Sequence, residues 1–218
     1  MPRTAETTVF IVDDDEGVRD SLSMLVDANG FLVETYGSAQ GFLDQYQPER
    51  PGCLILDMRL PDLGGLDLLE RLAGMGAGLP VIILTGHGDV PAAVHAMKVG
   101  AMDFIEKPFD SGHLLERIEQ AVDRDRQSRS QSADHAKLAA RIAQLTPRER
   151  EIMELIVSGK ANKVIAFELD ISERTVELHR SRMMKKLQVR SLAELIRVSA
   201  VHGSSAGEHS DAGHTQGN

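Results

Sequence analysis

This 218-residue chain has only one cysteine and no long apolar run. Its single cysteine, Cys53, excludes a disulfide and a cysteine zinc cluster within the chain, and its apolar neighbours favour a small buried packing residue. No apolar run approaches the ~20 residues of a membrane-spanning helix, and the N-terminus lacks the basic and then apolar layout of a signal peptide. The sequence therefore predicts a cytoplasmic protein with no membrane partner.

Charge is unevenly distributed along the chain, whose net charge is −9. Residues 1–126 hold 22 acidic and 10 basic side chains, whereas residues 127–202 hold 9 acidic and 14 basic ones. A basic second part on an acidic chain suggests nucleic acid as a partner. A solvated basic face would give the same counts, so charge alone leaves both interpretations open.

Short apolar runs of strand length recur in the first part of the chain. They cover residues 8–12, 31–36, 53–57, 80–85 and 103–107. Segments with the apolar spacing of helices lie between them. Five strands alternating with five helices predict an α/β fold with a doubly wound, five-stranded parallel sheet.

Charged and hydroxyl side chains follow the ends of four of these runs. Asp13 and Asp14 end the first run, Asp57 the third and Thr85 the fourth, and Lys107 ends the fifth. Ligands of such sheets bind at the carboxyl ends of the strands, so we expect these side chains to share one crevice. Oxygen ligands around a partly hydrated site suit Mg²⁺ better than zinc or copper. The sequence therefore predicts a magnesium site.

The composition divides the chain into four parts. Residues from about 123 to 136 are rich in glutamine, serine and charge, which predicts a linker or an extension of the preceding helix. The last residues cannot build a core. We therefore expect a first domain over 7–122, a linker over 123–141, a second domain over 142–203 and a disordered tail over 204–218.

The second domain has the start signals of short helices. Thr146, Pro147 and Glu149 form a cap, a first-turn proline and the third residue of a capping box. Ser172 caps a longer helix, and Gly203 is expected to stop the last one. These signals predict a small all-α domain.

Several spaced motifs resemble known families. The stretches VDDDE at 12–16, LDMRLPDLGGLDLL at 56–69, ILTGHGD at 83–89 and FIEKPF at 104–109 closely resemble the receiver domain of bacterial two-component response regulators. Residues 145–195 resemble the LuxR-type helix-turn-helix domain. Together they resemble the NarL/FixJ class of response regulators, which implies a CheY-like receiver followed by a DNA-binding domain.

The resemblance to receivers implies phosphoryl transfer from a sensor histidine kinase. Asp57 matches the aspartate that accepts the phosphoryl group. Asp13 and Asp14 match the acidic pair that holds Mg²⁺, together with Asp57 and the backbone carbonyl of Arg59. Apart from its own magnesium-dependent phosphorylation and dephosphorylation, such a protein is not an enzyme.

The resemblance also implies the residues that respond to phosphate. Thr85 and Lys107 match the hydroxyl and the ammonium that contact the phosphoryl oxygens. Phe104 stands at the switch aromatic position, where it has no hydroxyl to anchor, so packing alone would drive its rotation. Arg59 and His87 stand at the positions that tune the lifetime of the acyl phosphate.

The resemblance to LuxR-type domains implies that residues 173–186 form the helix that enters the major groove of double-stranded DNA. The residues that would approach the DNA bases are Glu177, Leu178, Ser181 and Arg182. Phosphates would be contacted by Lys163, Arg174, Thr175, Arg180, Lys185 and Lys186. Glu177 could accept from cytosine or pair with Arg182, and Arg182 could bind guanine, contact a phosphate or remain solvated.

The last helix carries an apolar stripe that includes Leu192, Leu195 and Ile196. In the family this helix pairs two DNA-binding domains, so we expect a homodimer when the protein is phosphorylated. RNA polymerase is an expected partner, because most members of this class activate transcription.

Two other functions fit part of the sequence. A haloacid-dehalogenase-type phosphatase also uses an aspartate nucleophile with Mg²⁺, but it needs a second aspartate where this chain has Arg59. A receiver that only binds proteins would not need a helix-turn-helix. The sequence therefore favours a transcription factor controlled by phosphorylation.

Overall fold

The structure is a computed structural model that describes residues 7–86 and 90–207, with side chains up to residue 200. The chain forms two compact units, residues 1–130 and 131–218, and each is considered separately. Within the described ranges, no helix is both long and apolar enough to span a bilayer.

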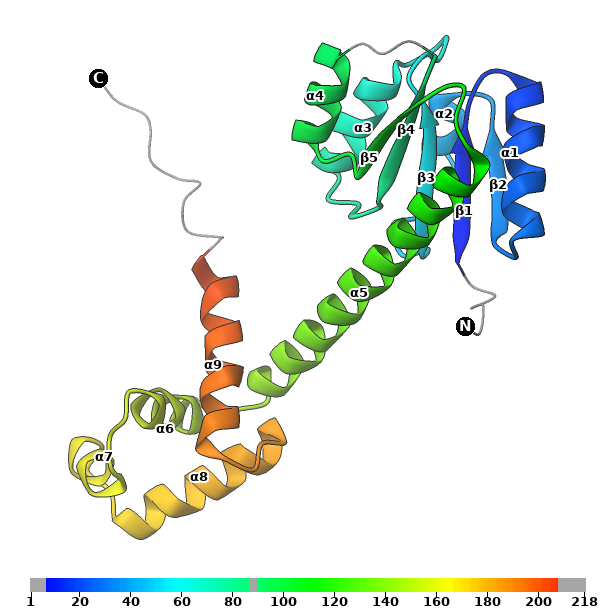
Figure 1. Cartoon of the computed structure of the whole chain (residues 1–218). Helices are drawn as coiled ribbons and strands as arrows, with labels where there is room; N and C mark the ends of the chain where they lie inside the picture. Colours follow the sequence, from blue (N-terminus) through cyan, green and yellow to red (C-terminus); the bar gives the residue numbers. More distant parts are fainter. Residues whose placement is uncertain (1–6, 87–89, 208–218) are drawn as a thin grey trace, which may run out of the picture. The chain divides into compact units, whose positions relative to one another are not determined.

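The first unit is built on one parallel sheet of five strands (Figure 1). The strands are β1 (Thr8–Val12), β2 (Leu32–Tyr36), β3 (Gly52–Asp57), β4 (Val81–Thr85) and β5 (Asp103–Glu106). Their order is β2-β1-β3-β4-β5, and every neighbouring pair is parallel. The predicted doubly wound sheet is therefore confirmed, and the strand order reverses direction at β1 and β3.

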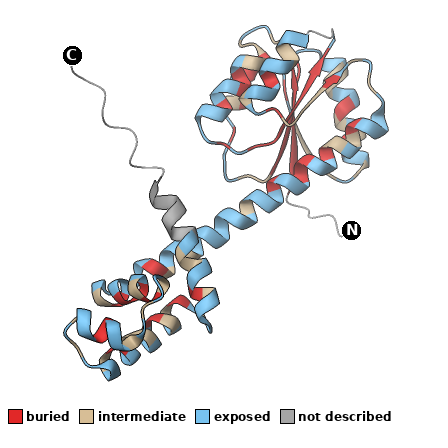
Figure 2. Cartoon of the chain, turned by 60° about the vertical axis from the view of Figure 1, so that its left-hand side comes forward, coloured by how far each residue is buried: buried red, intermediate tan, exposed pale blue. Residues whose placement is uncertain are grey.

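Helices cover both faces of this sheet. They are α1 (Glu16–Ala28), α2 (Ala39–Leu43), α3 (Gly65–Gly74), α4 (Val90–Val99) and α5 (Ser111–Ala143). Successive residues of β1 alternate between two cores: Val9 and Ile11 pack with α1 and α5, whereas Phe10 and Val12 pack with α2, α3 and α4. Figure 2 shows buried strands between these two layers, and the fully buried ones are β1, β3 and β4.

Helix α5 continues through the segment that the sequence indicated as a linker or a helical extension. Asp125 is only 3% exposed and accepts a hydrogen bond from the Gly52 amide at 3.0 Å. Arg129 holds the same carboxylate at 2.8 Å and donates to the carbonyls of Glu49 and Arg50. The first unit therefore extends to residue 130 instead of 122, because two charged residues anchor the helix to the start of β3.

The second unit is helical, as predicted. Its helices after α5 are α6 (Pro147–Val157), α7 (Asn162–Glu168), α8 (Glu173–Leu187) and α9 (Leu192–Gly207). The end of α5 also belongs to its core, because Ile142 is buried there and Leu138 packs against the same cluster. The unit therefore starts before residue 142.

Helix α9 ends at Gly207, four residues beyond the predicted stop at Gly203. A glycine inside a helix costs only about 1 kcal/mol, and the serine and alanine residues that follow it can continue the helix. The helix therefore includes residues 204–207, which the sequence analysis placed in the tail, and the rest of the tail lies outside the described residues.

Candidate phosphorylation site and DNA-binding surface

Lys107 joins two carboxylates at the carboxyl ends of the central strands. Its ammonium Nζ lies 2.7 Å from Oδ2 of Asp13 and 2.6 Å from Oδ1 of Asp57. Both aspartates are buried, with exposed fractions of 2% and 7%. Residues 13, 57 and 107 are far apart in the sequence, and they meet because β1, β3 and β5 end at the same edge of the sheet.

The four consecutive acids after β1 have separate structural roles. Asp13 binds Lys107, and Asp15 caps α1 by accepting from the amides of Gly17 and Val18. Glu16 lies in the first turn, where a negative charge interacts favourably with the helix dipole. Asp14 is exposed, and its carboxylate forms no hydrogen bond with a described residue. The sequence analysis missed the cap, although an aspartate directly before a helix is a recognised signal.

Asp57 lies at the end of β3 in a tightly packed turn. Its Oδ2 accepts a hydrogen bond from the Arg59 amide at 2.7 Å. A side chain at Gly65 would bring its Cβ to 2.5 Å from the Asp57 carbonyl oxygen, so only glycine fits at the start of α3. The loop therefore fixes both the carboxylate of Asp57 and the backbone of Arg59.

The predicted switch residues lie on β4 and β5. Thr85 ends β4 and is buried, and its carbonyl accepts a hydrogen bond from the Lys107 amide at 2.6 Å. Phe104 is half-buried and packs against the core under α2, α3 and α4. The structure thus places the backbones of Thr85 and Lys107 side by side. His87 lies outside the described residues.

The charge state of Lys107 follows from its surroundings. Burial alone would lower the pKa of Lys107, but hydrogen bonds to Asp13 and Asp57 outweigh that effect and raise the pKa above its ordinary 10.5. Lys107 is therefore a permanent cation at physiological pH, positioned between two carboxylates.

The donor atoms around Lys107 suit a hard cation. Two carboxylates and one ammonium sum to a charge of −1, and oxygen donors are what Mg²⁺ prefers. In the part of the chain that the structure describes, no three His, Cys, Asp or Glu side chains lie close enough to hold a metal by themselves. Mg²⁺ commonly uses one or two carboxylates and keeps several waters, so Asp13, Asp57 and the Arg59 carbonyl could hold it. The structure does not bring the Asp14 carboxylate into this group.

In the second unit, the start of α8 is well defined. The Ser172 hydroxyl accepts from the Thr175 amide at 3.1 Å and hydrogen-bonds the Thr175 hydroxyl at 2.8 Å. Val176, Met183 and Leu187 are buried in the core of the second unit, so this face of α8 packs inward. The opposite face of α8 is therefore the one presented to solvent.

Most of the residues expected to contact DNA are exposed. They are Lys163, Arg174, Glu177, Leu178, Ser181, Arg182 and Lys185. Thr175 and Arg180 are half-buried, and Arg180 donates to the Asn162 side chain at 3.4 Å. Glu177 and Arg182, which are both described, form no ion pair with each other, so the alternative that paired them is not observed.

Lys186 is engaged inside the unit. Its Nζ lies 2.6 Å from Glu149, whose side chain is 3% exposed, and 3.2 Å from the Gln144 carbonyl. Burial raises the pKa of Glu149, but the hydrogen bonds from Lys186 and the Thr146 amide outweigh burial and hold the pKa below its ordinary 4.5. The structure therefore shows Lys186 in an internal ion pair, whereas the resemblance assigned it to a DNA phosphate.

The apolar stripe of α9 is divided between core and surface. Leu195 is fully buried in the core of the second unit, whereas Leu192 and Ile196 are 43% and 44% exposed. Leu195 is thus a packing residue and not a dimer contact, which corrects the prediction. Ile196 and Ala200 line an apolar groove of about 440 Å³ with Met153 and Val157 of α6.

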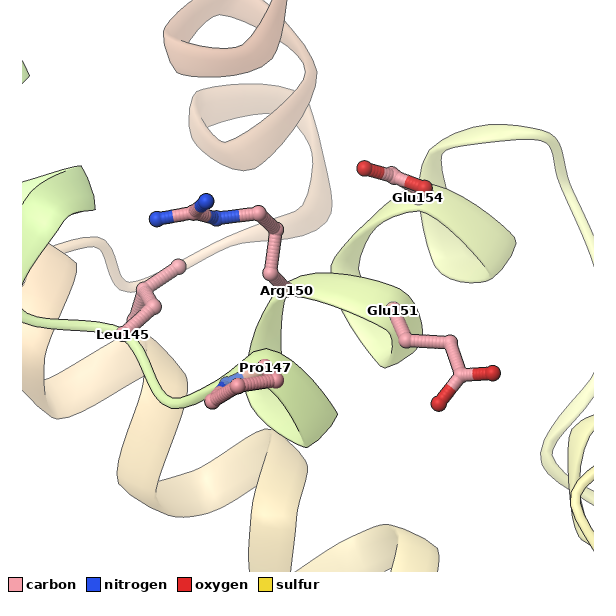
Figure 3. A pocket seen from close by; sticks show the side chains of 5 residues that line it. All are labelled: Leu145, Pro147, Arg150, Glu151 and Glu154. Carbon is pink, nitrogen blue, oxygen red and sulfur yellow. The ribbon is translucent and has the colours of Figure 1, made fainter.

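A second hollow, of about 310 Å³, lies at the start of α6 (Figure 3). It is lined by Leu145, Pro147, Arg150, Glu151 and Glu154. Its two carboxylates, those of Glu151 and Glu154, are exposed on the helix surface, and the set contains no hydroxyl, thiol or imidazole. The hollow is therefore no candidate for a second reaction site.

Comparisons with known proteins agree with this geometry. Residues 9–119 match the family of response regulator receiver domains, and residues 143–199 match the luxR family of bacterial regulatory proteins. The chain is 44% identical over 196 residues to the transcriptional regulatory protein FixJ of Bradyrhizobium diazoefficiens, covering 90% of this chain and 96% of that protein. The chain belongs to the response regulators with a LuxR-type DNA-binding domain.

Other members of this family are similar over almost the whole chain. Nodulation protein W of Bradyrhizobium diazoefficiens is 43% identical over 203 residues, covering 93% of this chain and 89% of that protein. The solved structure of the response regulator StyR has a TM-score of 0.83 at 43% identity and covers 90% of this chain and 99% of its own. The function of this response regulator is phosphorylation-dependent regulation of transcription, and its two domains are those of a regulator rather than an enzyme.

Proposed function

We propose that Asp57 accepts a phosphoryl group from a sensor histidine kinase and that the resulting acyl phosphate controls DNA binding. The observation that carries this proposal is the ammonium of Lys107 between Asp13 and Asp57, 2.6 Å from an oxygen of Asp57. A carboxylate is a weak nucleophile toward phosphorus, so a fixed cation beside it is what the reaction requires.

In the proposed reaction, one carboxylate oxygen of Asp57 attacks the phosphorus as the bond to the donor breaks. The Arg59 amide keeps the other oxygen in place, because it donates to Oδ2 at 2.7 Å. Lys107 then pairs with the phosphoryl oxygens, since its ammonium already reaches both carboxylates.

Asp13, Asp57 and the Arg59 carbonyl would hold Mg²⁺, with Asp14 contributing from its exposed position. When bound, Mg²⁺ would neutralise charge on the transferring phosphoryl oxygens. The position two residues after Asp57 is the exposed Arg59 and not a carboxylate, so the site lacks the acid that a phosphatase would use. This supports a phosphoryl group that persists as a signal.

We further propose that Thr85 and Phe104 convert the phosphate into a change of packing. The Thr85 hydroxyl would hydrogen-bond the phosphate and draw the end of β4 toward it. Phe104, half-buried against the same core, would repack into the space near the moved strand. In this way the charge of the phosphoryl group on Asp57 would cause a rearrangement of α4 and β5.

The proposed output is a homodimer on double-stranded DNA. The exposed cations of α8 support phosphate contact, Leu178 and Ser181 support contact with bases, and Leu192 and Ile196 support pairing through α9. We propose that such a dimer acts in the cytoplasm and recruits RNA polymerase as an activator, in line with relatives named as transcriptional regulators.

The test measures DNA binding by wild type and Asp57→Asn, with fragments selected from random or genomic DNA. Each protein is assayed with and without acetyl phosphate and Mg²⁺. We expect affinity to rise with the phosphodonor for the wild type and to remain constant for the variant. Equal binding by both proteins in every condition would refute control of DNA binding by phosphorylation of Asp57. It would still support the DNA-binding role of the second domain.

Asp20→Asn is the matched control, because Asp20 is an exposed aspartate on α1. It removes the same charge and leaves the carboxyl ends of the strands unchanged. We expect Asp20→Asn to respond to acetyl phosphate as the wild type does. A loss of response in the control as well would show that the assay reports net charge and not the chemistry of Asp57.

A further inference from the structure

The side chain of one arginine contacts only backbone carbonyls at the candidate magnesium site. Arg19, the fourth residue of α1, donates from one guanidinium nitrogen to the carbonyl of Asp13 at 2.8 Å and to that of Asp14 at 2.9 Å. These are the two residues whose side chains the resemblance assigns to the metal. Arg19 thus fixes the peptide groups from which both carboxylates project.

The contacts of Arg19 leave the carboxylate oxygens available. Among the described residues, its guanidinium forms no ion pair, although the four acids at 13–16 lie only three to six positions before it in the chain. The Asp13 carboxylate instead binds Lys107 and the Asp15 amide. Arg19 therefore holds the loop without competing for the oxygens that would ligate a cation.

The loop has few other anchors. The Asp13 amide donates to the Tyr36 carbonyl at 3.2 Å, and the Asp15 side chain caps α1. Nothing else among the described residues restrains the Asp14 carbonyl, and Asp14 is exposed. The half-buried guanidinium of Arg19 is the contact that ties this exposed peptide to the helix.

We propose that Arg19 is a positioning residue for the divalent cation of the receiver: it orients the Asp13–Asp14 backbone and so raises the affinity of the site for Mg²⁺. This inference rests on the proposed function, because it requires that Mg²⁺ binds at Asp13 and Asp57. Residues that orient metal ligands without touching the metal commonly change affinity about 10- to 100-fold when they are replaced.

The sign of the effect distinguishes positioning from simple electrostatics. Arg19 carries a positive charge close to the site, so removing that charge alone would strengthen the binding of a cation. Loss of backbone positioning would weaken it. Arg19→Gln combines both changes, and we expect the weaker binding to dominate by roughly tenfold.

The experiment titrates Mg²⁺ into the unphosphorylated full-length protein by calorimetry. Arg19→Gln is expected to bind roughly tenfold more weakly than wild type. Arg19→Lys keeps the charge and one donor, and its affinity should lie between the two. Phosphorylation by acetyl phosphate should slow in Arg19→Gln at low Mg²⁺ and recover when Mg²⁺ saturates the site, which a general folding defect would not do.

Arg129→Gln is the matched control, because Arg129 also donates to two backbone carbonyls, those of Glu49 and Arg50, at the opposite end of the strands. Its Mg²⁺ affinity should equal that of wild type. A metal-free readout is amide hydrogen exchange of Asp15, whose N–H bonds the Asp13 carboxylate; exchange should accelerate in Arg19→Gln only.

The outcomes separate the inference from the proposed function. Equal or tighter Mg²⁺ binding by Arg19→Gln overturns the role of Arg19. A wild type that takes up no Mg²⁺, or an Asp13→Asn variant that binds it as well as wild type does, overturns the proposed magnesium site itself.

Discussion

Lys185 and Lys186 are neighbours in α8 with the same side chain, yet the structure gives them opposite roles. Lys185 is exposed, whereas Lys186 binds the buried carboxylate of Glu149 at 2.6 Å. Replacing each lysine by methionine removes one positive charge from the same helix. The pair of variants therefore separates a DNA contact from a structural ion pair.

The magnitude for Lys186→Met follows from burial. Removing one partner of a fully buried ion pair costs about 3–5 kcal/mol. The Lys186 side chain is 34% exposed, so the cost is reduced to about 2 kcal/mol by solvent screening. For a unit of this size, that loss corresponds to a fall in Tm of roughly 10 °C.

Lys185→Met should have the complementary effect. A lysine that neutralises one phosphate contributes about 0.9 to the slope of log affinity against log salt concentration. The slope should therefore fall by about that amount per bound protomer, with Tm nearly unchanged. For Lys186→Met we expect a lower Tm and the wild-type slope.

Two measurements check this pair: calorimetric unfolding, and DNA binding between 50 and 200 mM salt, the range over which phosphate contacts change affinity strongly. The dependence of stability on pH in the acidic range adds a further test. Because the folded pKa of Glu149 is lowered, its stabilisation is present above the unfolded value of 4.5 and is lost as pH falls through the folded pKa. Lys186→Met should lack this loss. A wild-type Tm with a reduced salt slope in Lys186→Met would refute the internal ion pair.

Three further outcomes follow from the first unit. Asp125→Ala should destabilise it by about 3 kcal/mol and speed hydrogen exchange of the Gly52 amide, because a buried N–H loses its acceptor; unchanged exchange would contradict the anchor. Since the pKa of Lys107 is raised, the stability difference between wild type and Lys107→Met, measured by denaturant unfolding, should be constant from neutral pH up to 10.5 and shrink as pH rises through the folded pKa. Substituting Arg59 or His87 should change the decay rate of the acyl phosphate more than the extent of phosphorylation, and unchanged decay in both variants would reject their tuning role.

The alternation of apolar runs and helical spacing was enough to predict the sheet. A parallel strand buried on both faces leaves a short apolar run, and β1, β3 and β4 are such runs. The polar residues at strand ends also predicted the site, because parallel strands place their carboxyl ends at one edge. Lys107 between Asp13 and Asp57 has this origin.

Other features depend on contacts between residues far apart in the sequence. The charged segment DRDR gives no sign that Asp125 is buried, because its burial requires the Gly52 amide and Arg129 around it. Asp13 and Asp14 are adjacent aspartates that the sequence does not distinguish. The turn into α1 buries Asp13 and exposes Asp14.

The sequence by itself therefore determined the class of fold, the order of the two domains and the kind of chemistry at the strand ends. These depend on periodicity and on local signals that each segment carries alone. The tertiary structure decided which of several like residues serves which purpose. Lys186 pairs with the buried Glu149 and Lys185 faces solvent, and Leu195 is core while Ile196 is surface. Burial and pairing are properties of the packed chain, so adjacent residues of the same kind can differ in role although their local sequence is nearly the same.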